Sequence, residues 1–474
     1  MKRRTVLALA SSSLVALAGC LGGDDETGTD EGPVGANGND GANGDDGANG
    51  EDDLAFDSPT EGAKTLLETL AAEEYEDAID VFSEEAREFA VPAQLEANWR
   101  AFLNTGGAFE AIQETEETAD AGFDAVDVTV AFERSEHRVR IVVDASNAPQ
   151  TMFLNDEYQK PDYADADAFD VTTSEFERDG CLMDAIITVP ADADGDVPGV
   201  LLVHGSDPLG IADMDLTTGI PQLPGDGSKP FTDIAEGLAS QGVAVYRYDR
   251  RTFACNVDPA AHTLDGVVFD DALAALADFR DVAGVDADRI VVAGLSLGGM
   301  AVPRIADRDG NLAGGVALAA PGRSFYESTL DQLAHLSTVT DLEWEQAQNQ
   351  YEDWQDRVDR IRDGDYSPED LILDHPGALW ESLDEYDHRQ TACDIDVPLL
   401  FLQGDRDYQV TVEDDLATWE NELDGREDTQ FETYEGLNHL FQFGDGPSVP
   451  DEYGLYNPVN EAVVTDIASW VAGR

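Results

Sequence analysis

Three residues of this 474-residue chain have the types and the spacing of a nucleophilic catalytic site. Ser296 lies in a Gly-Leu-Ser-Leu-Gly pentapeptide, and Asp407 and His439 follow it in the chain. A serine hydroxyl needs a neighbouring base to take its proton, and an imidazole needs a carboxylate to fix its tautomer. Each residue follows a segment that reads as a strand, at 290–293, 398–403 and 431–434. This order predicts Ser296 as nucleophile, Asp407 as acid and His439 as base.

Attack by Ser296 would create an oxyanion, for which backbone N–H groups are the usual donors. One donor is expected from Leu297, the residue after the nucleophile. The other is expected from the loop after an early strand, where the apolar run 199–203 is followed by His-Gly-Ser. This spacing indicates the N–H of Ser206. We expect His204 to support this loop rather than to titrate.

Competing residues exist for the acid and the base. Asp405 also follows Gly404 closely, but the acid of such sites usually lies in the turn a few residues past the strand, which favours Asp407. The other histidines precede or interrupt the series of expected strands, so His439 is preferred by position. They are His137, His204, His262, His335, His375 and His388.

Longer segments share their pattern with one enzyme family. They are Val203–Ser206, Lys229–Val243, Arg247–Thr252, Leu295–Met300, Pro303–Ala306, Ala319–Pro321, Gln403–Val410 and Gly436–His439. Over roughly residues 175–474 the chain thus resembles the serine carboxylesterases of the esterase D type, within the α/β-hydrolase superfamily. The resemblance implies hydrolysis of short-chain carboxylic esters by Ser296, Asp407 and His439. It implies no metal and no organic cofactor.

One loop departs from that family's pattern. After His-Gly-Ser the family usually continues with a glycine and an acidic–basic–acidic cluster, whereas this chain has Asp207–Ile211. The shape of the acyl pocket, and with it the substrate, is therefore left open.

The charge balance bounds where such an enzyme works. One hundred acidic residues against 27 basic ones give a formal charge of −73, which repels nucleic acid and anionic membranes. Only four residues are lysines (Lys2, Lys64, Lys160 and Lys229). This composition resembles that of proteins from extreme halophiles, in which molar salt screens the repulsion, and predicts salt-dependent activity. The alternative of calcium-binding carboxylates has no spaced Asp-x-Asp-x-Asp-Gly loop to support it.

The amino terminus resembles a lipoprotein signal of the haloarchaeal type. A basic start with a twin arginine (Lys2–Thr5) precedes an apolar stretch too short to span a bilayer (Val6–Leu17). Small residues then lead to Cys20, the expected lipidated first residue of the mature chain. Residues 21–57 are rich in Gly, Asp and Asn and are expected to form a disordered acidic linker. We expect export and attachment to the outer face of the cell membrane by this anchor alone.

The remaining chain divides into two expected domains. In residues 58–160, helical spacing at 59–70, 75–82 and 92–102 precedes alternating strands at 125–132 and 138–143, which predicts a small α+β domain. It resembles the uncharacterised nuclear-transport-factor-like domain that often precedes these esterases. Its aromatic residues are interpreted as core, with a ligand pocket as the alternative (Trp99, Phe102, Phe109 and Phe132).

Residues 161–474 alternate strands with helices, which predicts an α/β fold with a doubly wound, mostly parallel sheet. The alternation stops over about 324–390, where polar helices suggest a cap over the active site. Trp380 and Tyr386 in this cap could line an acyl pocket or pack against the sheet.

Three cysteines remain after Cys20, and they permit at most one disulfide among three pairings (Cys181, Cys255 and Cys393). A nucleophilic role for Cys255 is the alternative, but Ser296 already occupies the expected turn.

Two other functions compete with a lipid-anchored esterase acting on small-molecule esters. A peptidase of the prolyl-peptidase or aminopeptidase kind shares the fold and the triad. It needs a site for the substrate amine, for which Glu343–Glu345 is a candidate. The second rival is a non-catalytic lipoprotein that binds a ligand through residues 58–160. A full set of triad residues argues against it.

Overall fold

A computed structural model describes residues 55–191, 195–206, 228–339 and 344–474, with only the backbone for 344–350. The predicted signal peptide, Cys20, the linker up to residue 54, the loop Asp207–Ile211 and the side chains of Glu343–Glu345 lie outside the described part.

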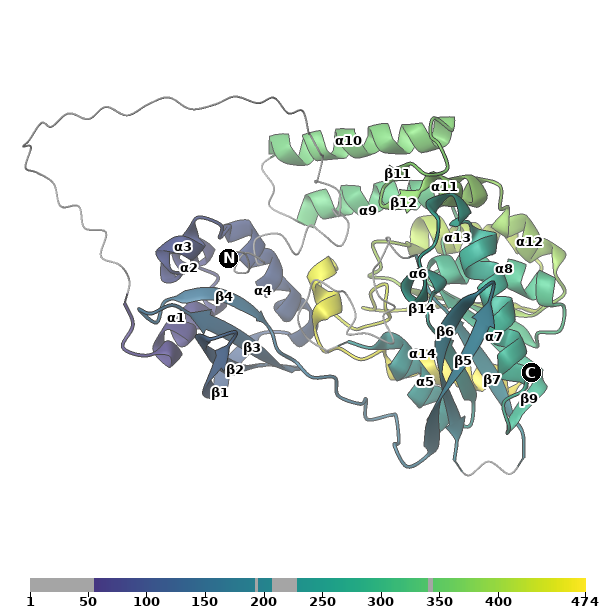
Figure 1. The fold of residues 1–474 in the computed structure, drawn as a ribbon, viewed down its shortest axis with the longest axis horizontal. Coiled ribbons are helices and arrows are strands. Elements are labelled where there is room, and N and C mark those ends of the chain that lie inside the picture. Colours follow the sequence, from purple (N-terminus) through teal and green to yellow (C-terminus); the bar gives the residue numbers. More distant parts are fainter. Residues whose placement is uncertain (1–54, 192–194, 207–227, 340–343) are drawn as a thin grey trace, which may run out of the picture.

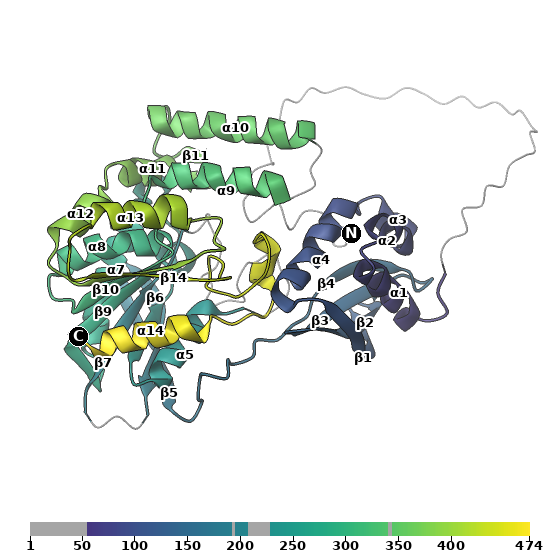
Figure 2. The same cartoon turned by 180° about the vertical axis from the view of Figure 1, so that it is seen from behind.

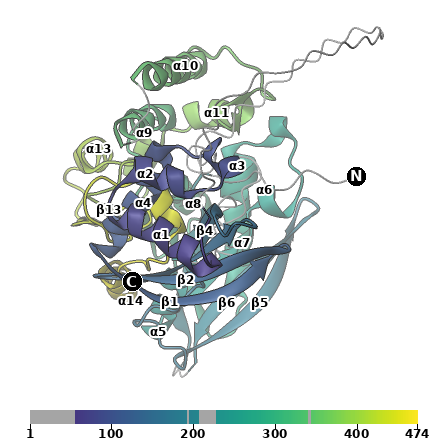
Figure 3. The ribbon, with the colours of Figure 1, turned by 90° about the vertical axis from the view of Figure 1, so that its left-hand side faces the viewer.

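The N-terminal domain pairs four helices with an antiparallel sheet in the order β1-β2-β3-β4. Its elements are α1 (Pro59–Ala71), α2 (Tyr75–Val81), α3 (Glu84–Arg87), α4 (Pro92–Gly106), β1 (Phe109–Asp120), β2 (Phe123–Phe132), β3 (Glu136–Val143) and β4 (Pro149–Leu154). Ser58 caps α1 by accepting the N–H of Glu61, and Pro59 occupies the first turn, where its missing N–H costs nothing. Helices α1 and α4 pack on the sheet (Figure 3).

The predicted elements of this domain are confirmed to within a few residues, but α3, β1 and β4 were not predicted. Strand β1 has half-buried residues at every third position rather than at alternate ones, so its sequence shows no strand period. The aromatic residues of the N-terminal domain form its core, as expected. The ring of Trp99 lies 5.7 Å from the rings of Phe102 and Phe132 and 5.9 Å from that of Phe109.

The large domain is built on an eight-stranded sheet in the order β14-β13-β10-β9-β7-β8-β6-β5. Its strands are β5 (Phe169–Arg178), β6 (Cys181–Pro190), β7 (Val197–Val203), β8 (Ala244–Tyr248), β9 (Val285–Leu295), β10 (Gly314–Leu318), β13 (Leu399–Gly404) and β14 (Thr429–Tyr434). Only the pairs β5–β6 and β6–β8 are antiparallel. The predicted doubly wound, mostly parallel sheet is confirmed.

Helices cover both faces of this sheet. On one face α5 (Pro230–Ser240) lies beside α14 (Glu461–Ala472), and on the other α7 (Asp270–Arg280) and α8 (Leu297–Asp309) pack against β9 (Figures 1 and 2). Shorter elements are α6 (Arg251–Ala254), α13 (Ala417–Glu422), η1 (Pro259–Ala261), η2 (Asp265–Phe269), η3 (Val412–Leu416) and η4 (Pro450–Gly454). Among the described residues, no helix is both long and apolar enough to cross a membrane.

Between β10 and β13 the chain forms mainly helices. They are α9 (Phe325–Val339), α10 (Trp344–Asp363), α11 (Gly377–Asp384) and α12 (His388–Asp394), with a small hairpin of β11 (Leu371–Ile372) and β12 (His375–Pro376). Trp380 donates its indole N–H to the Ile372 carbonyl at 2.8 Å, and the Tyr386 hydroxyl donates to the Met300 carbonyl at 3.1 Å. Both aromatic side chains belong to the core of the large domain.

The two domains share apolar packing. Val339, Val449 and Leu455 of the large domain belong to the same buried cluster as Leu95 and Phe102 of the N-terminal domain. Figure 1 shows the short yellow helix η4 beside α4, and the two elements are in contact.

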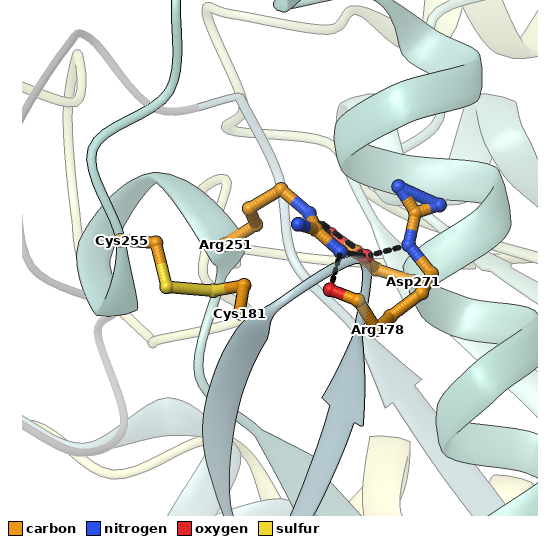
Figure 4. Close-up of a disulfide and its surroundings, with 5 residues drawn as sticks. All are labelled: Arg178, Cys181, Arg251, Cys255 and Asp271. Carbon is orange, nitrogen blue, oxygen red and sulfur yellow. Dashed lines mark hydrogen bonds and ion pairs between the residues drawn. A yellow bond between two sulfur atoms is a disulfide. The ribbon is translucent and has the colours of Figure 1, made fainter.

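A disulfide joins Cys181, at the start of β6, to Cys255, directly after α6 (Figure 4). Beside it Arg251 pairs with the buried Asp271, and Nε of Arg178 lies 2.7 Å from the same carboxylate, which makes a second ion pair. A disulfide sulfur is not a thiolate, so the nucleophile reading of Cys255 is wrong. Cys393 is free and exposed.

We expect this disulfide to contribute to stability, because it restricts the unfolded chain over a separation of 74 residues. The double substitution Cys181→Ala, Cys255→Ala should lower the free energy of unfolding by about 2–4 kcal/mol. Urea unfolding followed by tryptophan fluorescence measures this, with Cys393→Ala as the control that stays near wild type. An unfolding midpoint that reductant leaves unchanged would contradict the expectation.

Candidate active site

Ser296 occupies a strained turn between β9 and α8. Its φ of 57° and ψ of −120° are rarely adopted by a residue with a side chain, and such strain is typical of nucleophiles held at the tip of a strand. The two glycines of the pentapeptide make the turn possible. A Cβ on Gly294 would lie 2.1 Å from the Gly298 carbonyl oxygen. The pattern therefore reflects backbone packing at Ser296.

The loop after β7 packs directly against this turn. A Cβ on Gly298 would lie 2.4 Å from the carbonyl oxygens of Val203 and His204, and one on Gly205 would lie 3.2 Å from the Cβ of Ser296. The predicted donors at Leu297 and Ser206 thus belong to two backbone segments that meet at Ser296. Leu297 begins α8, where N–H groups lack partners within the helix and the helix dipole favours negative charge.

Two side chains hold this loop. Arg250 donates from Nη2 to the carbonyl oxygen of Gly205 at 2.7 Å. His204 is buried, and its Nε2 lies 2.5 Å from the Tyr248 carbonyl oxygen. This contact agrees with the expected supporting role of His204. Sequence reasoning did not assign a role to Arg250, although it lies in a segment that resembles the esterases.

His439 and Asp407 form a buried pair after the ends of β14 and β13. Nδ1 of His439 lies 2.7 Å from Oδ2 of Asp407. The carboxylate also accepts the Gln403 amide at 2.9 Å and the N–H groups of Gln409 and Val410 at 2.8 and 3.1 Å. These charge-assisted bonds compensate the cost of burying the carboxylate and fix its orientation.

The competing acid has another partner. Asp405 accepts the N–H of Gly436 at 2.7 Å, which ties the turn after β13 to the turn after β14. Asp407 is thus the aspartate that contacts His439.

The sheet brings the three predicted residues to one edge. Strands β9, β10, β13 and β14 are neighbours and parallel, so their carboxyl ends lie together, where ligands bind in open α/β sheets. The N–H of Ser296 donates to the Leu318 carbonyl at 2.8 Å, and the N–H of Ala319 donates to Leu402 at 2.9 Å. The structure therefore joins Asp407 to His439 directly and places Ser296 at the same edge.

A cavity opens beside the predicted oxyanion loop. Its lining consists of Val203, His204, Gly205, Tyr248, Arg250, His262, Val267, Val268, Leu297 and Leu379. Burial lowers the pKa of His262 to about 4, with a contribution from the charge of Arg250. Burial likewise lowers the pKa of His375 to about 3. Both imidazoles are therefore neutral near pH 7.

A second chain of hydrogen bonds from serine to histidine to aspartate lies in the N-terminal domain. The Ser135 hydroxyl is 2.9 Å from Nε2 of His137, whose Nδ1 is 2.7 Å from Asp156. The ring of His137 packs edge-on against Phe102 at 5.2 Å, and a Cβ on Gly106 would lie 2.5 Å from the Ser135 hydroxyl. We interpret this chain as core hydrogen bonding that satisfies a buried imidazole.

In the part of the chain that the structure describes, no group of three or more His, Cys, Asp or Glu side chains is arranged to hold a metal ion.

Comparison with known proteins places both domains. Residues 200–453 match the model of the alpha/beta hydrolase family, and residues 63–148 match a family described as a protein of unknown function, DUF3887. Esterase EstD of Thermotoga maritima is 31% identical over 424 residues, which cover 88% of this chain and 96% of EstD.

Two solved structures are less similar to this chain in sequence than EstD is. Est1E from Butyrivibrio proteoclasticus is 16% identical, with a TM-score of 0.39 over 64% of this chain and 96% of its own. The proline iminopeptidase of Mycobacterium smegmatis is also 16% identical, with a TM-score of 0.41 over 64% of this chain and 98% of its own. Neither value bears on activity. The family match over more than half of the chain and the relationship to EstD show that this protein belongs to the alpha/beta hydrolase family.

Proposed function

We propose that this protein is a serine esterase that hydrolyses small carboxylic esters through Ser296, His439 and Asp407. The observation that carries the proposal is the buried hydrogen bond between His439 and Asp407, at the sheet edge where Ser296 occupies its strained turn. The 31% identity to an esterase over nearly the whole of both chains supports it.

The chemistry proceeds in two stages. His439 takes the proton of Ser296 as its Oγ attacks the ester carbonyl, and gives that proton to the leaving alcohol. Water, activated by the same imidazole, then hydrolyses the acyl-enzyme. Asp407 orients the ring and stabilises its charged form. The N–H groups of Leu297 and Ser206 hold the oxyanion of each tetrahedral intermediate.

We further propose that the enzyme works outside the cell, attached by lipid at Cys20. The disulfide of Cys181 and Cys255 supports this location, because disulfides persist in oxidising compartments and are rare in the cytosol. The excess of carboxylates supports a salty medium, in which their mutual repulsion is screened.

Esterase and peptidase activity are distinguished by whether the protein cleaves p-nitrophenyl esters or p-nitroanilides. We expect turnover of p-nitrophenyl acetate and butyrate in molar salt, and a fall in kcat of at least about 10⁴-fold in Ser296→Ala. Ser135→Ala is the matched control, because Ser135 bonds a different histidine of the same chain. Ester turnover that survives Ser296→Ala would refute the triad. Cleavage of aminoacyl or Xaa-Pro p-nitroanilides alone would favour the peptidase.

Arg250 is expected to orient the backbone N–H of Ser206, the proposed oxyanion donor. The carbonyl of Gly205 and the N–H of Ser206 belong to one planar peptide and point in opposite directions, so fixing the carbonyl fixes the N–H. Arg250→Ala should lower kcat by about tenfold, less than the hundredfold or more lost with a donor itself. Because every ester forms the same oxyanion, acetate and butyrate should be affected equally. A loss confined to the longer ester would assign Arg250 to the acyl pocket instead.

A further inference from the structure

A buried carboxylate lies where the N-terminal domain meets the large domain. Glu452, on η4, is fully buried. Its Oε1 accepts the side-chain N–H of Asn104 at 2.8 Å and pairs with Arg406. Its Oε2 accepts the hydroxyl of Ser448 at 3.2 Å and lies 3.5 Å from the amide nitrogen of Asn438. We call these five residues the Glu452 cluster.

Two members of the cluster are chain neighbours of the acid–base pair. Arg406 directly precedes Asp407, and Asn438 directly precedes His439. Asn438 also shapes the turn that presents the histidine, because its Oδ1 accepts the N–H groups two and four residues further along, at 3.0 and 3.1 Å. Glu452 therefore contacts both the loop that carries Asp407 and the loop that carries His439.

The N-terminal domain contributes one residue of the Glu452 cluster, from α4. Asn104 comes from the last turn of α4, whereas the other members belong to the large domain. Its side chain also donates to the Pro447 carbonyl at 2.9 Å, and its own carbonyl accepts the N–H of Asp445 at 2.9 Å. Arg134 adds an ion pair with Asp445 at 2.8 Å. The loop that carries Glu452 is thus fastened to the N-terminal domain by backbone and side chain.

Because the carboxylate of Glu452 is buried, its stability depends on the hydrogen bonds and the ion pair that it forms. A carboxylate removed from water is costly unless charge and hydrogen bonds compensate it. Arg406 supplies the charge, and Asn104 supplies a donor from across the domain boundary. Oε1 also accepts the N–H of Val449 at 3.2 Å, so loss of the Asn104 donor removes one of its three partners. We expect the carboxylate then to shift or admit water, and to displace Arg406 and with it the loop of Asp407.

We propose that the N-terminal domain positions the Asp407–His439 pair of the enzyme through Asn104 and Glu452. The proposal rests on the triad proposed above and gives a role to a domain whose family has no known function. Asn104 is a positioning residue, because it contacts Glu452 and not the site itself. Its contribution is to the rate of the chemical steps rather than to substrate binding.

The test compares two asparagines of α4 in the full-length protein. Asn104→Ala should lower kcat for p-nitrophenyl butyrate by about tenfold, below the roughly hundredfold cost of a 1 Å misplacement, with KM changed by less than about twofold. Asn104→Asp should lower kcat further, because it places a second carboxylate against Glu452. Asn98→Ala is the control, since Asn98 bonds Gln94 on its own helix and should keep kcat near wild type.

Two further measurements separate positioning from folding. Each variant's folded fraction is determined by circular dichroism, and its acylation rate by labelling with a fluorophosphonate in the folded protein. Slower labelling of folded Asn104→Ala supports the proposal. Equal kcat in Asn104→Ala and Asn98→Ala, or a loss that only follows the folded fraction, would overturn it. Ester turnover that persists in Ser296→Ala would refute the triad itself, whatever the asparagine variants show.

Discussion

The site depends on backbone segments that approach one another more closely than a side chain allows. At the carboxyl edge of the large sheet, Gly294 and Gly298 let the start of α8 pack against its own strand and against the loop after β7. Gly404 does the same between the acid and base loops, where a Cβ would lie 2.2 Å from the Leu437 carbonyl oxygen. Any larger residue at these positions would push the segments apart. The relative positions of Ser296, Asp407 and His439 therefore depend on these glycines.

The second constraint is charge. In a chain with 100 acidic and 27 basic residues, several arginines pair with buried carboxylates. Such pairs are Arg251–Asp271, Arg323–Asp415 and Arg406–Glu452. At Asp127, burial raises the pKa of the carboxyl, but hydrogen bonds and charges from Arg140 and Arg138 outweigh burial and hold the pKa below its usual range. These arginines thus compensate carboxylates inside the protein, while carboxylates that face solvent depend on salt for the screening of their mutual repulsion.

The difference between local sequence patterns and contacts between distant residues explains what could be predicted from the sequence. Strands β9 and β13 are apolar runs and β14 mixes apolar with polar residues, and each is followed by one of the three predicted site residues. Local pattern was therefore enough to predict Ser296, Asp407 and His439. Strand β1 was missed because its residues are mostly polar. The pairing of Cys181 with Cys255 and the bond from Asn104 to Glu452 join positions 74 and 348 residues apart. No local pattern encodes such contacts, which arise only when the domains are folded and packed.

The relationship to EstD bears on how the two domains belong together. The match covers 424 residues, more than the 314 residues of positions 161–474, so it must extend into the N-terminal domain. It also covers 96% of EstD, so that esterase contains a counterpart of both parts. A module needed only for tethering could be any soluble domain, joined by a linker with few contacts. Here the N-terminal domain shares a hydrophobic core with the large domain and supplies a hydrogen bond to Glu452, which pairs with Arg406 directly before Asp407. The two domains are thus better regarded as one enzyme than as a catalyst with an appended partner.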